Sequence, residues 1–197
     1  MGVVSCARPM LRAITNVVAF DDGPFDRRTR RGGVLLVGAV FARTRLDGVV
    51  SGRVRRDGRD ATARMAALLA GSQFDRHVRA ILLGGIAVAG FNVVDIHELA
   101  AVTGRPVVVV ARRAPRLDLI REALTRIPGG AHRWALIERA GPMEPAGKIW
   151  IQRAGITFDA TRAMLAATTL HGSLPEPLRV AHLIAGGIVA GKSRGRA

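Results

Sequence analysis

The 197-residue chain is poor in several residue types, and each shortage excludes a class of protein or site. It has one cysteine, Cys6, so it can form no intrachain disulfide and no cysteine-based zinc site. It has no tyrosine, and aromatic residues make up 4% of the chain, which argues against a base-stacking surface. It contains no apolar run of the roughly 18 residues that a membrane span needs, and no signal-peptide pattern. We therefore expect a cytoplasmic protein with neither a membrane nor a disulfide partner.

Acidic residues are also scarce relative to basic ones. Lys and Arg total 30 against 15 Asp and Glu, a formal net charge of +15, and only Lys148 and Lys192 among the basic residues are lysine. Arginine binds phosphate through a planar pair of N–H donors and keeps its charge when partly buried. The expected partner is a nucleic acid, contacted through its phosphate backbone. A basic proteome that uses arginine everywhere would produce the same composition without such a partner.

The pattern of apolar residues predicts one α/β domain over 1–197, with 1–15 as an N-terminal extension and 191–197 as a basic tail. Apolar segments separated by turn signals predict three antiparallel strands, at 16–22, 34–43 and 49–55. The later segments predict helices at 60–69, 92–103, 117–126, 158–170 and 177–188, and strands at 79–86, 106–111, 133–139 and 148–153. Hairpins followed by βαβ units predict a mixed sheet with helices on both faces.

The glycine-rich segment AILLGGIAVAGFN, residues 80–92, raises the question of a nucleotide-binding loop. A dinucleotide-binding loop needs G-x-G-x-x-G and an acidic residue roughly 20 positions later. Gly84, Gly85 and Gly90 do not have that spacing, and Arg105 stands near the expected acidic position. The C-terminal AGKSRG lacks the upstream glycine and the following helix of a P-loop. The glycines therefore indicate another role.

Carboxylates near the ends of the first and third strands are better candidates for chemistry. Asp21 and Asp22 end the first strand, and only one of them can face a given site because successive side chains point to opposite faces. Asp57 and Asp60 follow the third strand. Turn formation and helix capping account for these residues too. In an arginine-rich chain they also suit Mg²⁺ held against a phosphate.

Several sequence words occur together and in order: FDDGPF, DGRDAT, ILLGGIAVAGFNVVDI, PVVVVARR, WALIERAGP, GKIWIQRAGI and SLPEPLRVAHLIAGGI followed by GKSRGRA. Through these words, from about Asn16 to the C-terminus, the chain resembles the archaeal endonuclease dU family. That family is similar in fold to endonuclease V, within the ribonuclease H-like superfamily. The resemblance implies a ribonuclease H-like fold and a Mg²⁺- or Mn²⁺-dependent endonuclease acting on DNA with a deaminated base such as deoxyuridine.

The resemblance also implies roles for particular residues. The metal ligand is Asp21 or Asp22, a further catalytic carboxylate is Asp57 or Asp60, and the late catalytic group is His182. Where the family word Asp-Gly-Ile is expected, this chain has Gly84-Gly85-Ile86, so one expected carboxylate is missing. Gly85 and Asn92 are expected at the rim of the site. Phosphate contacts are expected from a set of arginines: Arg27, Arg28, Arg30, Arg31, Arg53, Arg55, Arg56, Arg112 and Arg113.

Three functions remain open from the sequence. The first is a DNA endonuclease whose activity is weakened by Gly84. The second is a catalytically inactive ribonuclease H-like protein that binds nucleic acid, which the missing carboxylate favours. The third, based on charge alone, is a structural protein associated with RNA. The position of Gly84 relative to Asp21 and Asp22 is the structural observation that bears most directly on the first two.

Overall fold

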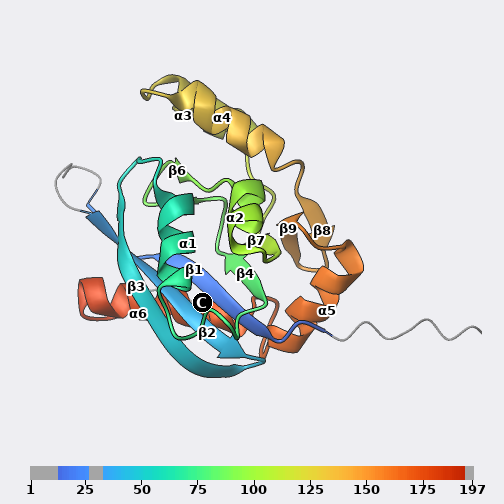
Figure 1. The fold of residues 1–197 in the computed structure, drawn as a ribbon. Helices are drawn as coiled ribbons and strands as arrows, with labels where there is room; N and C mark the ends of the chain where they lie inside the picture. The colour runs from blue at the N-terminus through green and yellow to red at the C-terminus, as the bar shows by residue number, and fades with distance from the viewer. Residues whose placement is uncertain (1–12, 27–32, 194–197) are drawn as a thin grey trace, which may run out of the picture.

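A computed structural model describes residues 13–26 and 33–193. At its centre lies a seven-stranded sheet with the strand order β3-β2-β1-β4-β7-β9-β8 (Figure 1). Its strands are β1 Asn16–Asp22, β2 Gly33–Ala42, β3 Arg45–Arg55, β4 Ala80–Leu83, β7 Val107–Ala111, β8 Glu144–Ala146 and β9 Ile149–Ala154. A separate hairpin pairs β5, Ala87–Val88, with β6, Asn92–Val93.

The strand directions confirm the predicted mixed sheet. β1, β2 and β3 pair antiparallel, whereas β4 pairs parallel to β1 and β7 pairs parallel to β4. β9 returns antiparallel to β7. Because β1, β4 and β7 run in the same direction, their C-terminal ends meet at one edge of the sheet, which we call the carboxyl edge. The beginning of β2 and the end of β3 also lie at this edge, since Gly33 pairs with Arg55.

Helices cover both faces of the sheet, also as predicted. On one face α1 (Ala61–Ala70) and α2 (Ile96–Thr103) pack Met65 and Leu99 into a core that contains Phe20 of β1. On the other face α5 (Phe158–Thr168) and α6 (Glu176–Ala190) pack against side chains that include Ala19 of the same strand. Alternate residues of the central strands thus enter two separate cores, which explains their continuous apolar sequences.

A helical hairpin of α3 (Leu117–Thr125) and α4 (Gly130–Arg139) projects from the rest of the molecule (Figure 1). The strand predicted at 133–139 is wrong, because these residues belong to α4. The buried positions of α4 are Gly130, Arg133 and Ile137, a spacing of three and four that is typical of a helix with one buried face. Because Arg133 occupies one of these buried positions, the helical spacing of apolar residues is not evident in the sequence.

Other boundaries differ from the prediction around the glycine-rich segment. The strand predicted at 79–86 ends at Leu83, and Gly85 has a φ of +124°, which side-chain-bearing residues rarely adopt. The helix predicted from residue 92 or 93 begins at Ile96, because Asp95 is its N-cap and accepts a hydrogen bond from the backbone N–H of Glu98. Within the two described ranges, no helix has the length and apolar character needed to cross a membrane.

Candidate active site

Asp21 and Asp22 end β1 at the carboxyl edge, and their side chains lie on opposite faces of the sheet. Asp21 faces α6, where its Oδ2 lies 2.9 Å from Nδ1 of His182. Asp22 faces the β5–β6 hairpin, where its Oδ2 accepts a hydrogen bond of 3.0 Å from the backbone N–H of Ala89. The alternation expected of a strand is therefore observed, and each carboxylate has its own hydrogen-bond partner.

Burial raises the pKa of both carboxyl groups. Desolvation raises the pKa of Asp21, although its hydrogen bond to His182 opposes the change. Desolvation raises the pKa of Asp22 to about 6, opposed by the bond from Ala89 and reinforced by the negative charge of Asp21. The charged forms of both residues are thus short of compensating charge, and a cation bound beside them would supply it.

Gly84 directly follows β4 and lies beside Asp21. A Cβ atom placed on Gly84 would be 3.7 Å from Oδ1 of Asp21 and 3.8 Å from Cδ2 of Leu178, which are ordinary contact distances. The backbone of Gly84 is outside the left-handed region that favours glycine, whereas Gly85 has a φ of +124°. The chain therefore has room for a side chain at position 84, pointing toward the carboxylate of β1. This is the position at which the sequence resemblance implied an aspartate.

Asp57 and Asp60 lie in a different network, behind the β5–β6 hairpin. Oδ1 of Asp57 accepts a hydrogen bond of 2.9 Å from the N–H of Phe91, and its Oδ2 pairs with Arg56 at 3.1 Å. Asp60 accepts hydrogen bonds from the backbone and side chain of Arg55 and from Nδ2 of Asn92. Burial would raise the pKa of Asp60, but the hydrogen bonds from Asn92 and Arg55 hold it below its usual value. Both carboxylates are thus engaged in holding loops.

Asn92 is fully buried, and its side chain joins three segments. Its Oδ1 accepts a 3.1 Å hydrogen bond from the N–H of Ala61, the first residue of α1, and its Nδ2 donates to Asp60 and to the carbonyl of Arg55. Asp60 stands at the N-cap position of α1 without a side-chain capping bond, so Asn92 supplies that bond from a distant part of the chain. Asn92 supports the rim of the site from inside the protein.

Ala89 of the β5–β6 hairpin connects Asp22 with Asp57. Ala89 donates its N–H to Asp22 and accepts a 2.9 Å hydrogen bond from the backbone N–H of Asp57. Arg133, a residue that the sequence analysis did not single out, locks this region from α4. It is 5% exposed and donates to the carbonyls of Phe91, Pro128, Asp57 and Gly58. The four-residue spacing between Arg133 and Ile137 is the sequence feature that could have indicated that Arg133 lies on the buried face of a helix.

The predicted phosphate-binding arginines are distributed along the carboxyl edge as far as the structure describes them. Arg53 and Arg55 are exposed near the end of β3, while Arg56 is partly buried against the ring of Phe25. Arg112 and Arg113 are exposed directly after β7. The remaining four, Arg27, Arg28, Arg30 and Arg31, lie outside the described residues. The topology thus places cationic groups on both sides of the acidic pair.

The acidic pair resembles a partial metal site. In the part of the chain that the structure describes, no three His, Cys, Asp or Glu side chains form a group suited to holding a metal ion. Mg²⁺, however, keeps several of its waters and commonly takes only one or two protein carboxylates together with substrate phosphate oxygens. Either Asp21 or Asp22 fits this weaker mode of binding, in which the substrate completes the coordination.

Comparison with known proteins places the chain among close sequence relatives. It is 52% identical over 184 residues to a UPF0215 protein of Deinococcus radiodurans, covering 93% of both chains. It is 43% identical over 192 residues to a UPF0215 protein of Methanothermobacter thermautotrophicus, covering 95% of this chain and 94% of the relative. The crystal structure of an Archaeoglobus fulgidus protein of unknown function matches with a TM-score of 0.83 at 32% identity, covering 89% of this chain and 98% of that one.

More distant structures share the fold. Human endonuclease V matches with a TM-score of 0.53 at 15% identity, covering 87% of this chain and 83% of that one. Ciona intestinalis endonuclease V, solved with a DNA containing an inosine, matches with a TM-score of 0.55 at 11% identity, covering 85% and 83% of the two chains. The ribonuclease H-like fold is thereby confirmed. A family model described as endonuclease dU matches residues 13–189, and the chain therefore belongs to the endonuclease dU family.

Proposed function

We propose that this protein is a metal-dependent DNA endonuclease that acts on strands containing a deaminated base such as deoxyuridine. The observation that carries the proposal is the pair of desolvated carboxylates, Asp21 and Asp22, at the carboxyl edge of a strongly basic chain. Family membership and the fold shared with endonuclease V support nuclease chemistry. The inosine-containing DNA bound by the Ciona enzyme supports a DNA substrate with a deaminated base.

Within this proposal, Asp21, on the same face as His182 and beside Gly84, would hold Mg²⁺ or Mn²⁺, while Asp22 would add negative charge from the opposite face. The ion would stabilise the negative charge that develops on the phosphate. His182 positions Asp21 through the bond to Nδ1, and its ring is half-exposed to solvent. Arg112 and Arg113 would bind phosphates next to the scissile one. Asp57 and Asp60 contribute indirectly, because they hold the loops that frame Asp22.

The test is cleavage of uracil-containing and inosine-containing duplexes in the presence of Mn²⁺. We expect the wild type to cleave at least one of them, and Asp21→Asn and Asp22→Asn to lose on the order of a hundredfold or more in rate. Asp159→Asn, which neutralises an exposed carboxylate on α5, is the matched control and should leave the rate unchanged. Cleavage by the Asp21→Asn protein at the wild-type rate would reject the assignment of the site.

A second candidate function is nucleic-acid binding without catalysis, and the position of Gly84 favours it. In this case no metal-dependent cleavage occurs in the wild type, whereas binding with a steep salt dependence remains. Activity in the wild type would eliminate this candidate.

Gly84→Asp tests whether position 84 belongs to a metal site, and cleavage by this variant but not by the wild type would favour the second candidate. The new carboxylate would point toward Asp21, where two negative charges raise each other's pKa and bind a divalent cation more tightly than one does. We expect calorimetric titration with Mn²⁺ in the absence of DNA to show at least about tenfold tighter binding than the wild type. Gly187→Asp, at a site with no atom near its Cβ, serves as the control and should bind Mn²⁺ like the wild type. Equal Mn²⁺ affinity of Gly84→Asp and wild type would show that position 84 is not part of a metal site.

A further inference from the structure

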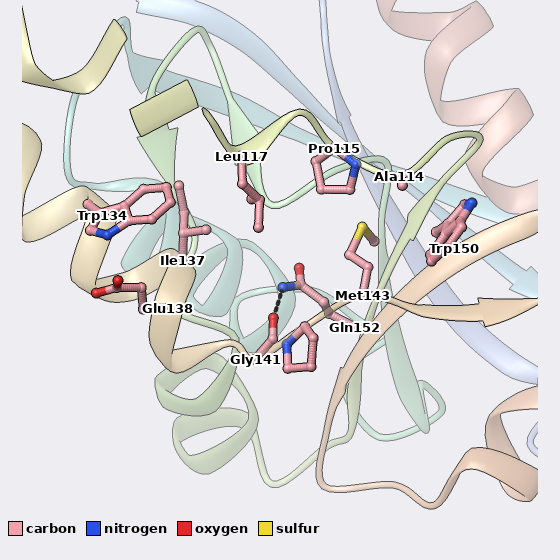
Figure 2. Close-up of a pocket in the computed structure, with 11 residues that line it drawn as sticks. Ala114, Pro115, Leu117, Trp134, Ile137, Glu138, Gly141, Met143, Trp150 and Gln152 are labelled. Atoms are coloured by element: carbon pink, nitrogen blue, oxygen red, sulfur yellow. Dashed lines mark hydrogen bonds between the residues drawn. The ribbon is translucent and has the colours of Figure 1, made fainter. Parts of the chain in front are cut away.

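An apolar hollow away from the acidic pair lies between the α3–α4 hairpin and strand β9. It has a volume of about 490 Å³ and is lined mainly by apolar side chains, which are shown in Figure 2. Both tryptophans of the chain, Trp134 on α4 and Trp150 on β9, line it, although they come from different elements. A hollow of this size with two large aromatic rings fits planar ligands. We call it the tryptophan groove.

The groove contains one well-placed polar group. Gln152 is 6% exposed, and its Nε2 donates a 2.5 Å hydrogen bond to the carbonyl of Gly141. Figure 2 shows the other end of the amide, the side-chain oxygen, pointing away from Gly141 into the hollow. An acceptor fixed in this way selects a ligand that carries an N–H group. In addition, the indole N–H of Trp134 is buried and has no hydrogen-bond partner among the described residues.

Several arginines lie close to the groove. Arg113 and Arg116 are exposed on the segment that leads from β7 to the groove, and Arg121, which lines a neighbouring hollow, has its guanidinium 5.3 Å from the centre of the Trp134 ring. Acidic side chains nearby include Glu138, which lines the groove, and Asp118, which lies 3.9 Å from Arg116. Apolar walls flanked by several arginines match a ligand with planar bases and an anionic backbone.

The register of the sheet relates the groove to the acidic pair. Gln152 pairs with Val109, Val109 with Leu83, and Leu83 with Phe20, the residue before Asp21. Three strand spacings separate Gln152 from Phe20, which is about 14 Å, or the length of about four stacked nucleotides. A strand whose phosphate lay at Asp21 and Asp22 would therefore reach the groove within a few nucleotides.

We propose that the tryptophan groove binds unpaired bases of a single DNA strand next to the nucleotide at the acidic pair. The inference rests on the proposed function, since it takes DNA as the ligand and the acidic pair as the site of cleavage. A base paired in a duplex has both its faces and its hydrogen-bonding edge occupied, so it cannot lie against the apolar walls of the groove. The substrate strand is therefore unpaired at this point, and a free single strand binds here more readily than a duplex does.

The composition of the chain provides a direct measurement. With two tryptophans and no tyrosine, the intrinsic fluorescence of the protein comes from Trp134 and Trp150. In EDTA, where no cleavage occurs, titration with a 12-residue thymidine strand should quench this fluorescence. Heparin, which carries negative charge but no bases, and a 12-base-pair duplex should bind the arginines with much less quenching. Equal quenching by heparin or by the duplex would overturn the proposal.

Trp150→Ala tests the groove itself, with Trp150→Phe as the matched variant that keeps a ring. We expect Trp150→Ala to bind the thymidine strand about 5- to 150-fold more weakly than the wild type, and Trp150→Phe to stay close to the wild type. An unchanged urea unfolding midpoint verifies that the variant protein is folded. Wild-type affinity of a folded Trp150→Ala for the thymidine strand would overturn the proposal. If that variant does not fold, the quenching pattern of the wild type still decides the question.

Failure of this inference can be told apart from failure of the proposed function. A protein that cleaves uracil-containing DNA but shows no quenching by single strands keeps its proposed function and loses the groove as a base-binding site. A protein that shows the quenching but no cleavage keeps the groove and loses the nuclease assignment.

Discussion

Asp21 and Asp22 are adjacent in the sequence, yet each meets a different part of the fold. Asp21 is held by His182 of α6, and Asp22 by the backbone of Ala89 in the β5–β6 hairpin. Desolvation outweighs both hydrogen bonds, so burial raises the pKa of both groups. Carboxylates held in this way reduce the stability of the protein while they prepare it to bind a cation.

The stability cost of Asp22 depends on pH in a way that can be measured. Its folded-state pKa of about 6 exceeds the unfolded value of 3.8, so the folded state is favoured fully below about pH 3.8 and this advantage is lost as the pH rises through about 6. Asp22→Asn keeps an oxygen acceptor for Ala89 but carries no charge. We expect the variant to gain stability relative to the wild type with rising pH, by at most about 3 kcal/mol above pH 7.

Urea unfolding of both proteins at pH 5 and pH 7.5, without divalent cations, measures this difference. Asp159→Asn is again the control, because its carboxylate is exposed, and its difference from the wild type should not change with pH. A stability difference between Asp22→Asn and wild type that stays constant over this range would contradict the raised pKa of Asp22.

At the scale of elements, the β5–β6 hairpin is positioned almost entirely by long-range hydrogen bonds. Asp22 binds it at Ala89, Asp57 at Ala89 and Phe91, Arg133 at Phe91, and its own Asn92 anchors it to the start of α1. With two residues in each strand, the hairpin has little stability of its own. The surrounding side chains therefore determine where it lies, and with it one wall of the site.

Asn92→Ala should expose how much the hairpin and α1 depend on each other. The change removes the cap of α1 and leaves the carbonyl of Arg55 and the N–H of Ala61 without their buried partner. We expect a loss of about 2–4 kcal/mol in the free energy of unfolding, measured by urea denaturation. Thr103→Ala, which removes a hydroxyl bonded within its own helix, should change stability by less than about 0.5 kcal/mol. An Asn92→Ala protein as stable as the control would show that this cap does not hold α1.

At the scale of the whole molecule, the parallel arrangement of β1, β4 and β7 brings the important groups together. It places the acidic pair, Gly84 and the Arg112–Arg113 segment at one edge of the sheet, with the tryptophan groove beyond β7. The net charge of +15 favours binding of a polyanion, and in the proposed function the carboxyl edge would fix the register of the bound DNA.

Arg113→Ala should therefore weaken DNA binding in a salt-dependent manner. Removing one phosphate contact should reduce the slope of log K against log salt by about 0.9. Arg79→Ala is the matched control, since Arg79 is exposed immediately before β4, at the opposite edge of the sheet. We expect it to leave the slope close to that of the wild type. Fluorescence anisotropy of a labelled duplex over a range of salt concentrations measures both slopes, and equal slopes for the two variants would contradict an oriented DNA interface.

Most of the sheet could be predicted from the sequence because its signals are local. The antiparallel strands β2 and β3 are joined by a two-residue turn, and the four valines of β7 are typical of a strand buried on both faces. Helix α4 was mistaken for a strand because Arg133 occupies a buried position, where its charge hides the helical period. The 4% aromatic content gave no sign that both tryptophans would line one groove.

The sequence by itself determined the mixed α/β architecture, the basic character and the presence of a carboxylate pair at the end of the first strand, since these depend on composition, period and neighbouring residues. Only the tertiary structure decided which side chains meet. Asp21 contacts His182 across 161 residues of chain, Gly84 lies beside Asp21, and Asp57 and Asp60 turn to a separate network with Asn92. Strand order and register determine such contacts, and both result from packing the whole chain around two shared cores, which no local pattern encodes.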